Sequence, residues 1–378
     1  MRVGAMKEEK KIRKKIKIED LLPRDPVRVD LDAILDYVQG KAVLVTGGGG
    51  SIGSEICRQL AGHGVGHLII FDIYENNAYQ IQKSLEWEFP RLHMTVLIGS
   101  VRDERRLQSM FSHYRPDIVF HAAAHKHVPL MEDSPNEAIK NNVIGTLKTA
   151  RMASRYHVKK FILISTDKAV NPTNIMGASK RLCEMVIQMI GKHSTTEFAA
   201  VRFGNVLGSN GSVIPLFIDQ IKAGNPITIT DPNMTRFLMN LDEAVDLVLF
   251  AFQHANPGDL FIQKSDASTI GDLAKAVQQL FGDTGTNIIG TRHGEKLFET
   301  LMTREERLRS QDMGHYFRVA ADNRDLNYDK FVVKGEVHTM ADESYTSHNT
   351  ERLDVEGTVK KILTTEYVQN ALKGIPNV

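Results

Sequence analysis

Thr46-Gly-Gly-Gly-Gly-Ser-Ile-Gly53 comes directly after a short apolar run, Ala42-Val-Leu-Val45, and opens a segment of helical pattern. Three of its glycines are spaced as G-x-x-G-x-x-G. Glycines at that spacing permit a tight turn, let backbone N–H groups approach a pyrophosphate and allow a helix to pack closely on a strand. The N-terminus of the helix adds a field that favours an anion. The stretch therefore predicts a dinucleotide-binding βαβ unit, with loop contacts from Gly47, Gly50, Ser51, Ile52 and Gly53.

The alternation of strand, turn and helix continues from Lys41 to about Gly204. Short apolar runs suit strands that are buried on both faces of a parallel sheet, and they recur at 68–71, 94–98, 118–120, 161–164 and 198–203. Segments of helical length separate them, at 51–63, 105–113 and 135–157. This order predicts an α/β fold, a Rossmann-type doubly wound parallel sheet with helices on both sides.

After Gly204 the regular alternation fades, and turn-rich pieces separate shorter helical patterns at 241–254 and 270–281. They predict a smaller α+β region that closes over the carboxyl edge of the sheet. The last fifty or so residues are polar and carry no clear pattern. The expected organisation is a basic N-terminal arm with a packing helix (1–40), an NAD(P)-binding Rossmann domain (41–204), and a substrate-binding region with a C-terminal extension (205–378), partly interleaved with the domain before it.

The composition is that of a globular chain: 378 residues, 42% hydrophobic and 25% charged. A net charge of +1 gives no case for nucleic acid as the main partner. No run of eighteen apolar residues and no apolar signal core is present, so no transmembrane segment is expected. Two cysteines, Cys57 and Cys183, fit free thiols in a reducing cytoplasm. The basic stretch 7–17 is read as a solvated arm, with an anionic-lipid or nucleic-acid patch as the alternative.

Asp72 ends the second apolar run, nineteen residues after Gly53. A carboxylate at this point accepts hydrogen bonds from the adenosine ribose hydroxyls. A 2′-phosphate would instead need a cation, and no arginine or lysine lies between Asp72 and Gln82. The pattern favours NAD as the cofactor, with NADP as the alternative. Ser100 and Val101, after the third run, are expected to line the adenine pocket.

Ile164-Ser-Thr-Asp-Lys168, followed twelve residues later by Lys180, places a hydroxyl, a carboxylate and two amines in one neighbourhood. A hydroxyl beside a lysine suffices for simple oxidoreduction. An added acid and base indicate that a proton and a leaving group are also handled. The position four before Lys180, where a catalytic tyrosine is expected, is Met176. The plain alternative for this stretch is a strand-end turn with a surface ion pair.

The glycine spacing, His121-Ala-Ala-Ala124, Ser165-Thr-Asp-Lys168 and Lys180 together resemble the extended short-chain dehydrogenase/reductases. Within that group the chain resembles the UDP-N-acetylglucosamine 4,6-dehydratases of bacterial surface-polysaccharide synthesis. The segments that carry this closer resemblance are His125-Lys-His-Val-Pro129, residues 165–180, Arg202-Phe-Gly-Asn-Val206, residues 230–239 and Arg292-His-Gly-Glu-Lys296.

Two subgroups contribute to the resemblance. Residues 18–60 and 160–180 resemble the soluble half of the long, membrane-anchored dehydratases. Residues 225–370 resemble the short capsule-type enzymes that invert C5, so inversion at C5 is favoured over retention. Some members of both subgroups carry methionine at the position of Met176, which argues against simple inactivation.

The resemblance implies a reaction in three stages. Hydride leaves C4 of the sugar for the nicotinamide while O4 loses a proton. A base then removes the C5 proton, and the C6 hydroxyl leaves as water. Hydride finally returns to C6 and a proton to C5, so that a tightly bound cofactor is regenerated. The family pattern assigns Asp167 as the acid at the C6 hydroxyl and Lys168 as the base at C5, and it places Lys180 at the nicotinamide ribose.

Lys168 can act as a base only when it is neutral. Its pKa is therefore expected to fall from an ordinary value near ~10.4, through burial or a neighbouring positive charge such as Lys180. The thioether of Met176 cannot remove the O4 proton, and Met176 is expected to be a packing residue at the site wall. We hypothesise that Asp167 takes that proton, with Thr166 orienting O4.

The resemblance also implies contacts with a UDP-sugar. Arg236 and Arg292 are candidates for the diphosphate, because guanidinium groups match phosphate oxygens. Asn205 is expected near the phosphates and Glu295 at the uridine ribose.

Residues 121–127 hold three histidines, but no cysteine or carboxylate set completes a tetrahedral metal site. His125 and Lys126 are expected to line the sugar pocket, and the other two histidines are read as structural. The residues expected beside the cofactor in this segment are Ala122 and Ala123.

Two alternatives to the dehydratase remain. A UDP-HexNAc 4-epimerase shares the first hydride step but needs no acid–base pair at C5 and C6, and a non-catalytic dinucleotide-binding protein is supported only by Met176. As in relatives, the segments 105–113 and 135–157 are expected to supply a helical face for a homo-oligomer, a dimer or a hexamer.

Overall fold

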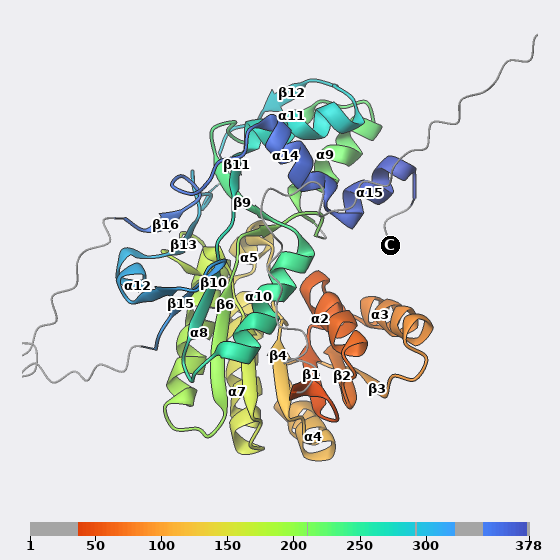
Figure 1. Cartoon of the computed structure of the whole chain (residues 1–378), viewed down its shortest axis with the longest axis vertical. Coiled ribbons are helices and arrows are strands. Elements are labelled where there is room, and N and C mark those ends of the chain that lie inside the picture. The colour runs from red at the N-terminus through yellow and green to blue at the C-terminus, as the bar shows by residue number, and fades with distance from the viewer. Residues whose placement is uncertain (1–36, 210, 292, 322–342, 376–378) are drawn as a thin grey trace, which may run out of the picture.

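The apolar runs of the first two hundred residues form the strands of one central sheet (Figure 1). The computed structural model describes residues 37–209, 211–291, 293–321 and 343–375. The expected basic arm and most of the expected N-terminal packing helix lie outside these residues. All six expected strands are present: β1 (Ala42–Thr46), β2 (His67–Asp72), β3 (Met94–Ile98), β4 (Ile118–His121), β5 (Lys160–Ile164) and β6 (Glu197–Arg202). Nearly every side chain of β1, β4 and β5 is buried, as a parallel sheet covered on both faces requires.

The sheet has nine strands in the order β14-β15-β10-β6-β5-β4-β1-β2-β3. All neighbouring strands from β3, at one edge, to β10 pair in parallel. Beyond β10, at the opposite edge, β15 pairs antiparallel with β10, and β14 pairs antiparallel with β15. The strands of this edge are β10 (Leu260–Gln263), β14 (Ser310–Asp312) and β15 (Tyr316–Val319). The chain reverses its direction of winding between β1 and β4, which lie side by side. In a doubly wound sheet, ligands bind outside the carboxyl ends of the strands at such a switch point.

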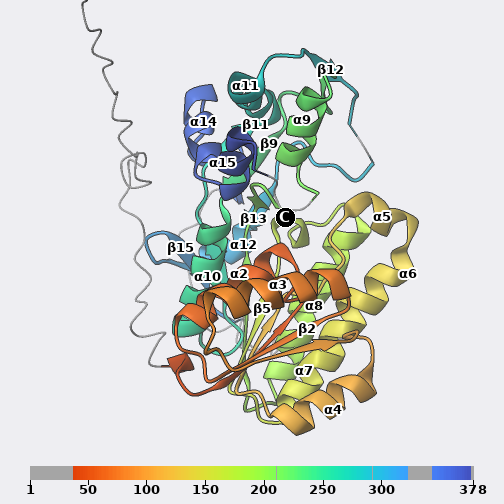
Figure 2. The same ribbon diagram turned by 90° about the vertical axis from the view of Figure 1, so that its right-hand side faces the viewer.

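Helices cover both faces of the sheet, which confirms the expected fold class (Figure 2). One layer contributes apolar side chains such as Ile56 and Val248 to the core, and the other contributes Phe111 and Ile187 to a second core. The first layer consists of α2 (Ser51–Gly62), α3 (Glu75–Glu88) and α10 (Leu241–His254). The second consists of α4 (Glu104–Tyr114), α7 (Gly145–Arg155) and α8 (Ile175–Gly191).

The helical segment expected over 135–157 is confirmed, because the chain is helical without a break from Pro135 to Arg155, but it contains an unpredicted π-helical turn. The segment consists of α6 (Pro135–Ala138), the π-helical segment η2 (Ile139–Ile144) and α7, and it follows the short helix α5 (Val128–Asp133). The wide turn brings the side chain of Asn142 inward, where its amide bonds the backbone N–H and C=O of His125 at 2.8 and 3.0 Å. π-helical turns inside helices occur frequently at functional sites, and this one fixes the loop after β4.

Parts of the chain beyond Gly204 build a second region above the sheet, while other parts, such as α10 and β10, belong to the sheet and its helices (Figure 1). Its core packs side chains of four helices against one strand, as in the contacts of Phe217, Val277 and Ile362. The helices are α9 (Val213–Lys222), α11 (Ile270–Phe281), α14 (Val355–Leu363) and α15 (Glu366–Lys373), and the strand is β8 (Ile227–Ile229). The last two helices lie in the polar C-terminal stretch, where no clear pattern predicted them.

Short strands link the second region to the sheet. One small sheet has three strands, in which β9 (Thr235–Met239) lies between β7 (Asn205–Val206) and β11 (Ala267–Thr269). In two further sheets, β12 (Thr286–Ile288) pairs with β8, and β13 (Thr300–Met302) pairs with β16 (Tyr345–Thr346). A short helix, α12 (Arg304–Leu308), follows β13. No helix of the described residues is long and apolar enough to cross a membrane.

Candidate active site at the switch point of the sheet

The glycine loop joins β1 to α2 directly at the switch point. Gly47 has φ +69°, a left-handed conformation, and a Cβ at this position would lie 2.7 Å from the backbone of Ala123 after β4. A Cβ on Gly53 would lie 2.1 Å from the carbonyl oxygen of Gly47. Only glycine fits either position. Gly50 occupies the N-cap of α2 and offers no side-chain cap, so the first amides of the helix remain open to an anion.

A cavity of about 180 Å³ opens beside this loop. Besides Gly47 and Gly50, it is lined by residues expected to contact the cofactor, namely Asp72, Ser100, Val101, Ala122 and Ala123. It is also lined by His125, which is expected at the sugar. Ser51 lines a neighbouring groove, and Ile52 packs against the core. The glycine cradle and the acid at the end of β2 fit the dinucleotide that the sequence predicts.

Asp72 does more than face the cavity. One carboxylate oxygen accepts from the N–H of Gly49 and the other from the N–H of Tyr74, both at 2.8 Å. The carboxylate is nearly buried, so the acid also fixes the shape of the glycine loop. Its negative charge at this place opposes a 2′-phosphate.

His121, at the end of β4, is structural. Its Nδ1 shares a hydrogen bond of 2.7 Å with the Thr46 hydroxyl, and its Nε2 shares one of 3.0 Å with the Thr146 hydroxyl. Burial, and then the charge of Lys180, lower the pKa of His121 to about 3. The neutral ring therefore ties β1 and β4 to α7 at the switch point.

The turn after β5 holds the acid and the lysine. Thr166 caps the 3₁₀ turn η3 (Asp167–Ala169) and donates a hydrogen bond of 2.8 Å to Oδ1 of Asp167. Lys168 Nζ donates to the same oxygen at 3.0 Å. The Asp167 side chain is fully buried, and its Oδ2 has no hydrogen-bond partner among the described residues. A buried carboxylate oxygen without a donor is costly, so Asp167 retains room to accept one.

Lys168 is surrounded by further polar groups. Its Nζ donates to Oδ1 of Asn205, the first residue of β7, at 3.3 Å, and lies 3.9 Å from Oε1 of Glu299. Burial lowers the pKa of Lys168, but the carboxylates of Asp167 and Glu299 outweigh it, and the pKa is raised. The expectation of a lowered pKa is wrong for this arrangement.

Lys180 does not supply the positive charge expected beside Lys168. Its Nζ donates to the carbonyl oxygen of Ile164 at 2.6 Å, and cations that interact with Lys168 are Arg236, Lys126 and Lys296. Lys180 lies one turn after Met176 on α8, which Asn174 caps by accepting from the N–H of Gly177. Met176 is 3% exposed and packs in a small apolar cluster with Met131 and Ala138.

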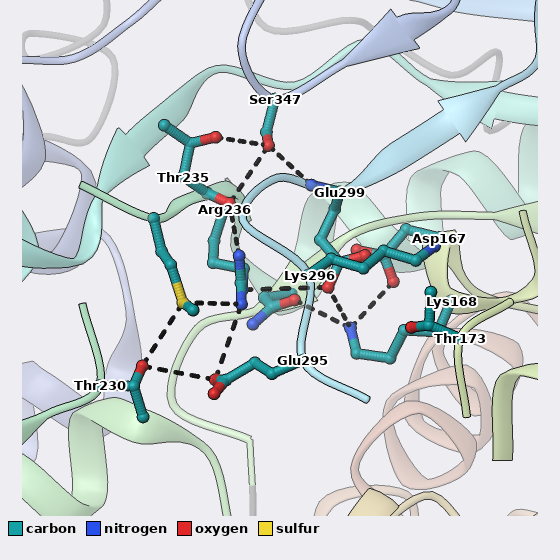
Figure 3. Close-up of polar contacts among 12 residues, drawn as sticks. Asp167, Lys168, Thr173, Thr230, Thr235, Arg236, Glu295, Lys296, Glu299 and Ser347 are labelled. Carbon is teal, nitrogen blue, oxygen red and sulfur yellow. Dashed lines mark hydrogen bonds and ion pairs between the residues drawn. The ribbon is translucent and has the colours of Figure 1, made fainter. Parts of the chain in front are cut away.

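Arg236, on β9, is held by carboxylates rather than left open. Its guanidinium lies 3.7 Å from Glu295 and 3.9 Å from Glu299, and it donates to the carbonyl oxygen of Thr235 at 2.8 Å (Figure 3). Glu295 also accepts from the Thr230 hydroxyl at 3.5 Å. Arg292 lies outside the described residues. Lys126 is exposed, and partial burial and then the charge of Lys168 lower its pKa.

Glu299 was not singled out in the sequence, and Arg202 was noted only within Arg202-Phe-Gly-Asn-Val206, without its partners. Glu299 stands at the end of a loop more than a hundred residues after Lys168. Arg202 is fully buried and bonds Glu184 of α8 and Glu306 of α12, while the Ser165 hydroxyl donates to Glu184 at 2.6 Å. This ion network lies directly behind the turn after β5. Contacts between residues so far apart in the chain are not visible in local spacing.

The sequence matches two family models along most of its length. The model described as polysaccharide biosynthesis protein matches residues 43–321, and the model described as polysaccharide biosynthesis protein C-terminal matches residues 322–369. The capsular polysaccharide biosynthesis protein CapD of Staphylococcus aureus is 44% identical over 347 residues, which cover 90% of this chain and 57% of CapD. A Rickettsia rickettsii protein named UDP-glucose 4-epimerase is 45% identical over 341 residues, which cover 88% of this chain and 98% of that protein.

Solved structures agree in fold. Pen from Bacillus thuringiensis superposes with a TM-score of 0.77 at 33% identity, over 87% of this chain and 99% of Pen. DesIV from Streptomyces venezuelae, a dTDP-glucose 4,6-dehydratase solved with NAD bound, gives a TM-score of 0.62 at 20% identity, over 68% of this chain and 86% of DesIV. The second likeness shows the fold alone.

Proposed function

The chain belongs to the polysaccharide biosynthesis protein family, within the short-chain dehydrogenase/reductases, and from this premise we propose that it is a nucleotide-sugar 4,6-dehydratase. The proposed substrate is UDP-N-acetylglucosamine, and the product is a UDP-4-keto-6-deoxy-hexosamine for surface-polysaccharide synthesis. The observation that carries the proposal is the pair at the end of β5. The fully buried carboxylate of Asp167 lies 3.0 Å from Nζ of Lys168, which is partly exposed, at the carboxyl edge of the sheet and beside a dinucleotide cradle.

The cofactor proposed for the cradle is NAD, held by Gly47, Gly50 and the first amides of α2, with Asp72 at the adenosine ribose. When bound, NAD would accept hydride from C4 and return it to C6, so that none is consumed. Asp72 favours NAD over NADP because its carboxylate would repel a 2′-phosphate.

Asp167 and Thr166, in the turn after β5, have different roles in the proposed proton transfers. Asp167 Oδ2 has no partner among the described residues, and it is the atom proposed to receive the O4 proton. Thr166, which donates to the other oxygen, holds the carboxylate in place. Once protonated, Asp167 can give that proton to the departing C6 hydroxyl. One proton thus moves from O4 to O6, and no tyrosine is needed at position 176.

The transfer of the O4 proton to Asp167 also changes the pKa of Lys168. Among the charges that raise the pKa of Lys168, the Asp167 carboxylate is the largest. Protonation of Asp167 removes that charge, and burial then lowers the pKa of the ammonium group. Oxidation at C4 thereby prepares Lys168 to act as the base at C5. The raised pKa of Lys168 before this step is consistent with a base that is released only after the ketone has formed.

Proton NMR of the purified protein with UDP-N-acetylglucosamine in deuterated water tests the proposal. A new C6 methyl signal with deuterium at C5 is the expected result, and the C5 coupling pattern distinguishes the favoured inversion from retention. Absence of a methyl signal, with cofactor measured in the same sample, would overturn the dehydratase proposal.

A nucleotide-sugar 4-epimerase is the second candidate, because a relative 45% identical along 98% of its length carries that name. Its reaction inverts C4 and leaves the C6 hydroxyl in place. In the same NMR experiment it would give UDP-N-acetylgalactosamine, with no methyl signal and no deuterium at C5.

A further inference from the structure

We propose that Glu299 is the proton acceptor for Lys168, so that the two side chains share one proton and Lys168 becomes neutral without releasing it to solvent. This inference rests on the proposed function, since it concerns the base at C5 in that reaction. Glu299 acts through Lys168 and contacts no reacting atom, so it is a positioning residue.

The geometry places the Glu299 carboxylate between two cations. Its Oε1 lies 3.9 Å from Lys168 Nζ and 3.9 Å from Arg236 Nε (Figure 3). Glu299 is 4% exposed, and its Oε2 has no hydrogen-bond partner among the described residues. One ion-pair contact to Lys168 and one unused oxygen leave this carboxyl group able to take a proton. A small rotation of either side chain, or one water, bridges the remaining distance.

Contacts from distant segments hold Glu299 in this place. Its backbone N–H donates to the Ser347 hydroxyl at 3.0 Å, and the N–H of Ser347 donates back to the Glu299 carbonyl at 2.9 Å. The Ser347 hydroxyl is also bonded to the Thr235 hydroxyl at 2.8 Å. The loop before Glu299 is attached to the catalytic turn, because Lys296 Nζ donates to the carbonyl oxygen of Val170 at 2.6 Å. The backbone that carries this carboxylate is therefore held beside the lysine.

The balance between the charged and the neutral pair depends on water. Burial raises the pKa of Glu299 and works to lower that of Lys168, so it favours the neutral pair, whereas their mutual attraction favours the ion pair. The Lys168 side chain is 26% exposed, and a sugar bound over it removes the water that stabilises the ammonium. The charged groups that face the pair from the neighbouring elements are Asp167, Arg236, Lys126 and Lys296.

The step is balanced within the site. A proton moves from Lys168 Nζ to Glu299 Oε1, and the freed lone pair takes the C5 proton. The electron pair of the C5–H bond forms the C5–C6 double bond, and the C6 hydroxyl leaves as water with the proton held by Asp167. The net charge of the Lys168–Glu299 pair is unchanged when its internal proton moves.

The test is the pH dependence of deuterium exchange at C5 in E299Q. Wild type is expected to show a flat rate between about pH 6 and 8, because its proton stays in the pair. In E299Q the proton must go to solvent, so the rate should be at least about tenfold lower near pH 6.5 and rise tenfold per pH unit. Glu299→Asp retains an acceptor and should restore the flat profile, and Glu86→Gln, the same change at an exposed ion pair, should match wild type.

An equal loss of rate at every pH would mean that Glu299 is only structural and would overturn the proposal. A higher rate in E299Q near neutral pH would also overturn it, because Glu299 would then merely hold the ammonium form.

A second measurement needs no substrate. In protein labelled with ¹³C at the lysine Cε, the Lys168 signal is identified by its loss in Lys168→Arg, and its titration is followed by NMR. E299Q should move that titration to lower pH by about 1–3 units. An unchanged titration would contradict coupling between the two groups. If wild type forms no C6 methyl product, the proposed function fails, while this titration still decides whether Glu299 and Lys168 are coupled.

Discussion

Arg202 and Glu184 are joined by two parallel hydrogen bonds, from Nε to Oε1 and from Nη2 to Oε2, each 2.7 Å long, in a fully buried layer behind the turn after β5. Glu306 bonds the other side of the same guanidinium at 2.8 and 2.9 Å. Bidentate pairs fix geometry as well as charge. Because the Ser165 hydroxyl donates to Glu184, the network holds the backbone from which Thr166, Asp167 and Lys168 project.

Replacing Arg202 by methionine leaves two carboxylates buried without their partner. We expect the free energy of unfolding to fall by about 3–5 kcal/mol, as measured by urea denaturation. Arg181→Met is the matched control, since Arg181 contacts the same Glu184 at 2.9 Å but is 43% exposed, and it should cost less than about 1 kcal/mol. Similar losses in the two variants would contradict a special role for the buried arginine.

Asp167→Asn removes the group proposed to accept the O4 proton. We expect it to abolish even the first half-reaction, measured as reduction of bound cofactor at 340 nm in a single turnover. Asp103→Asn serves as the control, because Asp103 caps α4 and asparagine caps a helix equally well. Normal cofactor reduction in Asp167→Asn would exclude the proposed transfer from O4 to this residue.

Gly47→Ala should release the cofactor. The added Cβ would lie 2.7 Å from the Ala123 backbone, so the loop must move away from β4. Gly64→Ala is a matched control, because Gly64 has a similar φ of +70° with nothing within 4 Å of its Cβ. Both variants should lose about 1–2 kcal/mol from the left-handed backbone, but only Gly47→Ala should yield denatured protein without dinucleotide, measured by chromatography of the supernatant. Equal dinucleotide content in the two would argue against the cradle.

Met176→Leu should keep the rate of cofactor reduction within about threefold of wild type. Met176 is 3% exposed among apolar side chains, and leucine conserves volume at a cost below about 1.5 kcal/mol. Neither side chain can carry a proton at this position. A loss of more than about tenfold, in protein of unchanged stability, would show that the thioether itself contributes to the first step.

The buried His121 should make stability depend on pH. Its folded pKa of about 3 lies below the unfolded value near ~6.5, so the unfolded state binds the additional proton between these values. The neutral His121 ring therefore makes its full contribution to the free energy of unfolding above about pH 6.5. This contribution is lost as the pH falls, by about 1.4 kcal/mol per pH unit. His121→Gln lacks this titration, so the difference in unfolding free energy between it and wild type should narrow by about 2 kcal/mol from pH 6.5 to 5. Parallel curves would contradict a neutral, buried ring.

Local patterns were sufficient for the strands and for the glycine loop. The apolar runs at β1 to β6 needed only their own composition to be recognised, because strands buried on both faces exclude polar side chains. The helix expected over 135–157 is present, but its π-helical turn η2, where the inward side chain of Asn142 bonds the loop after β4, was not predicted. A π-helical turn of this kind is fixed by a tertiary contact and leaves no periodic signal in the sequence.

The α/β class, the dinucleotide loop and the acid and lysine at the end of β5 could be predicted without a structure, since each depends on residues that are neighbours in the chain. The charge on Lys168 could not be predicted in this way, because it depends on how the chain folds. The sequence reading expected a lowered pKa, with Lys180 as the cause, whereas the fold brings Glu299 to 3.9 Å from its ammonium and turns Lys180 to the backbone of Ile164. Electrostatic energy depends on distance and on access to water, and both are set by segments more than a hundred residues apart.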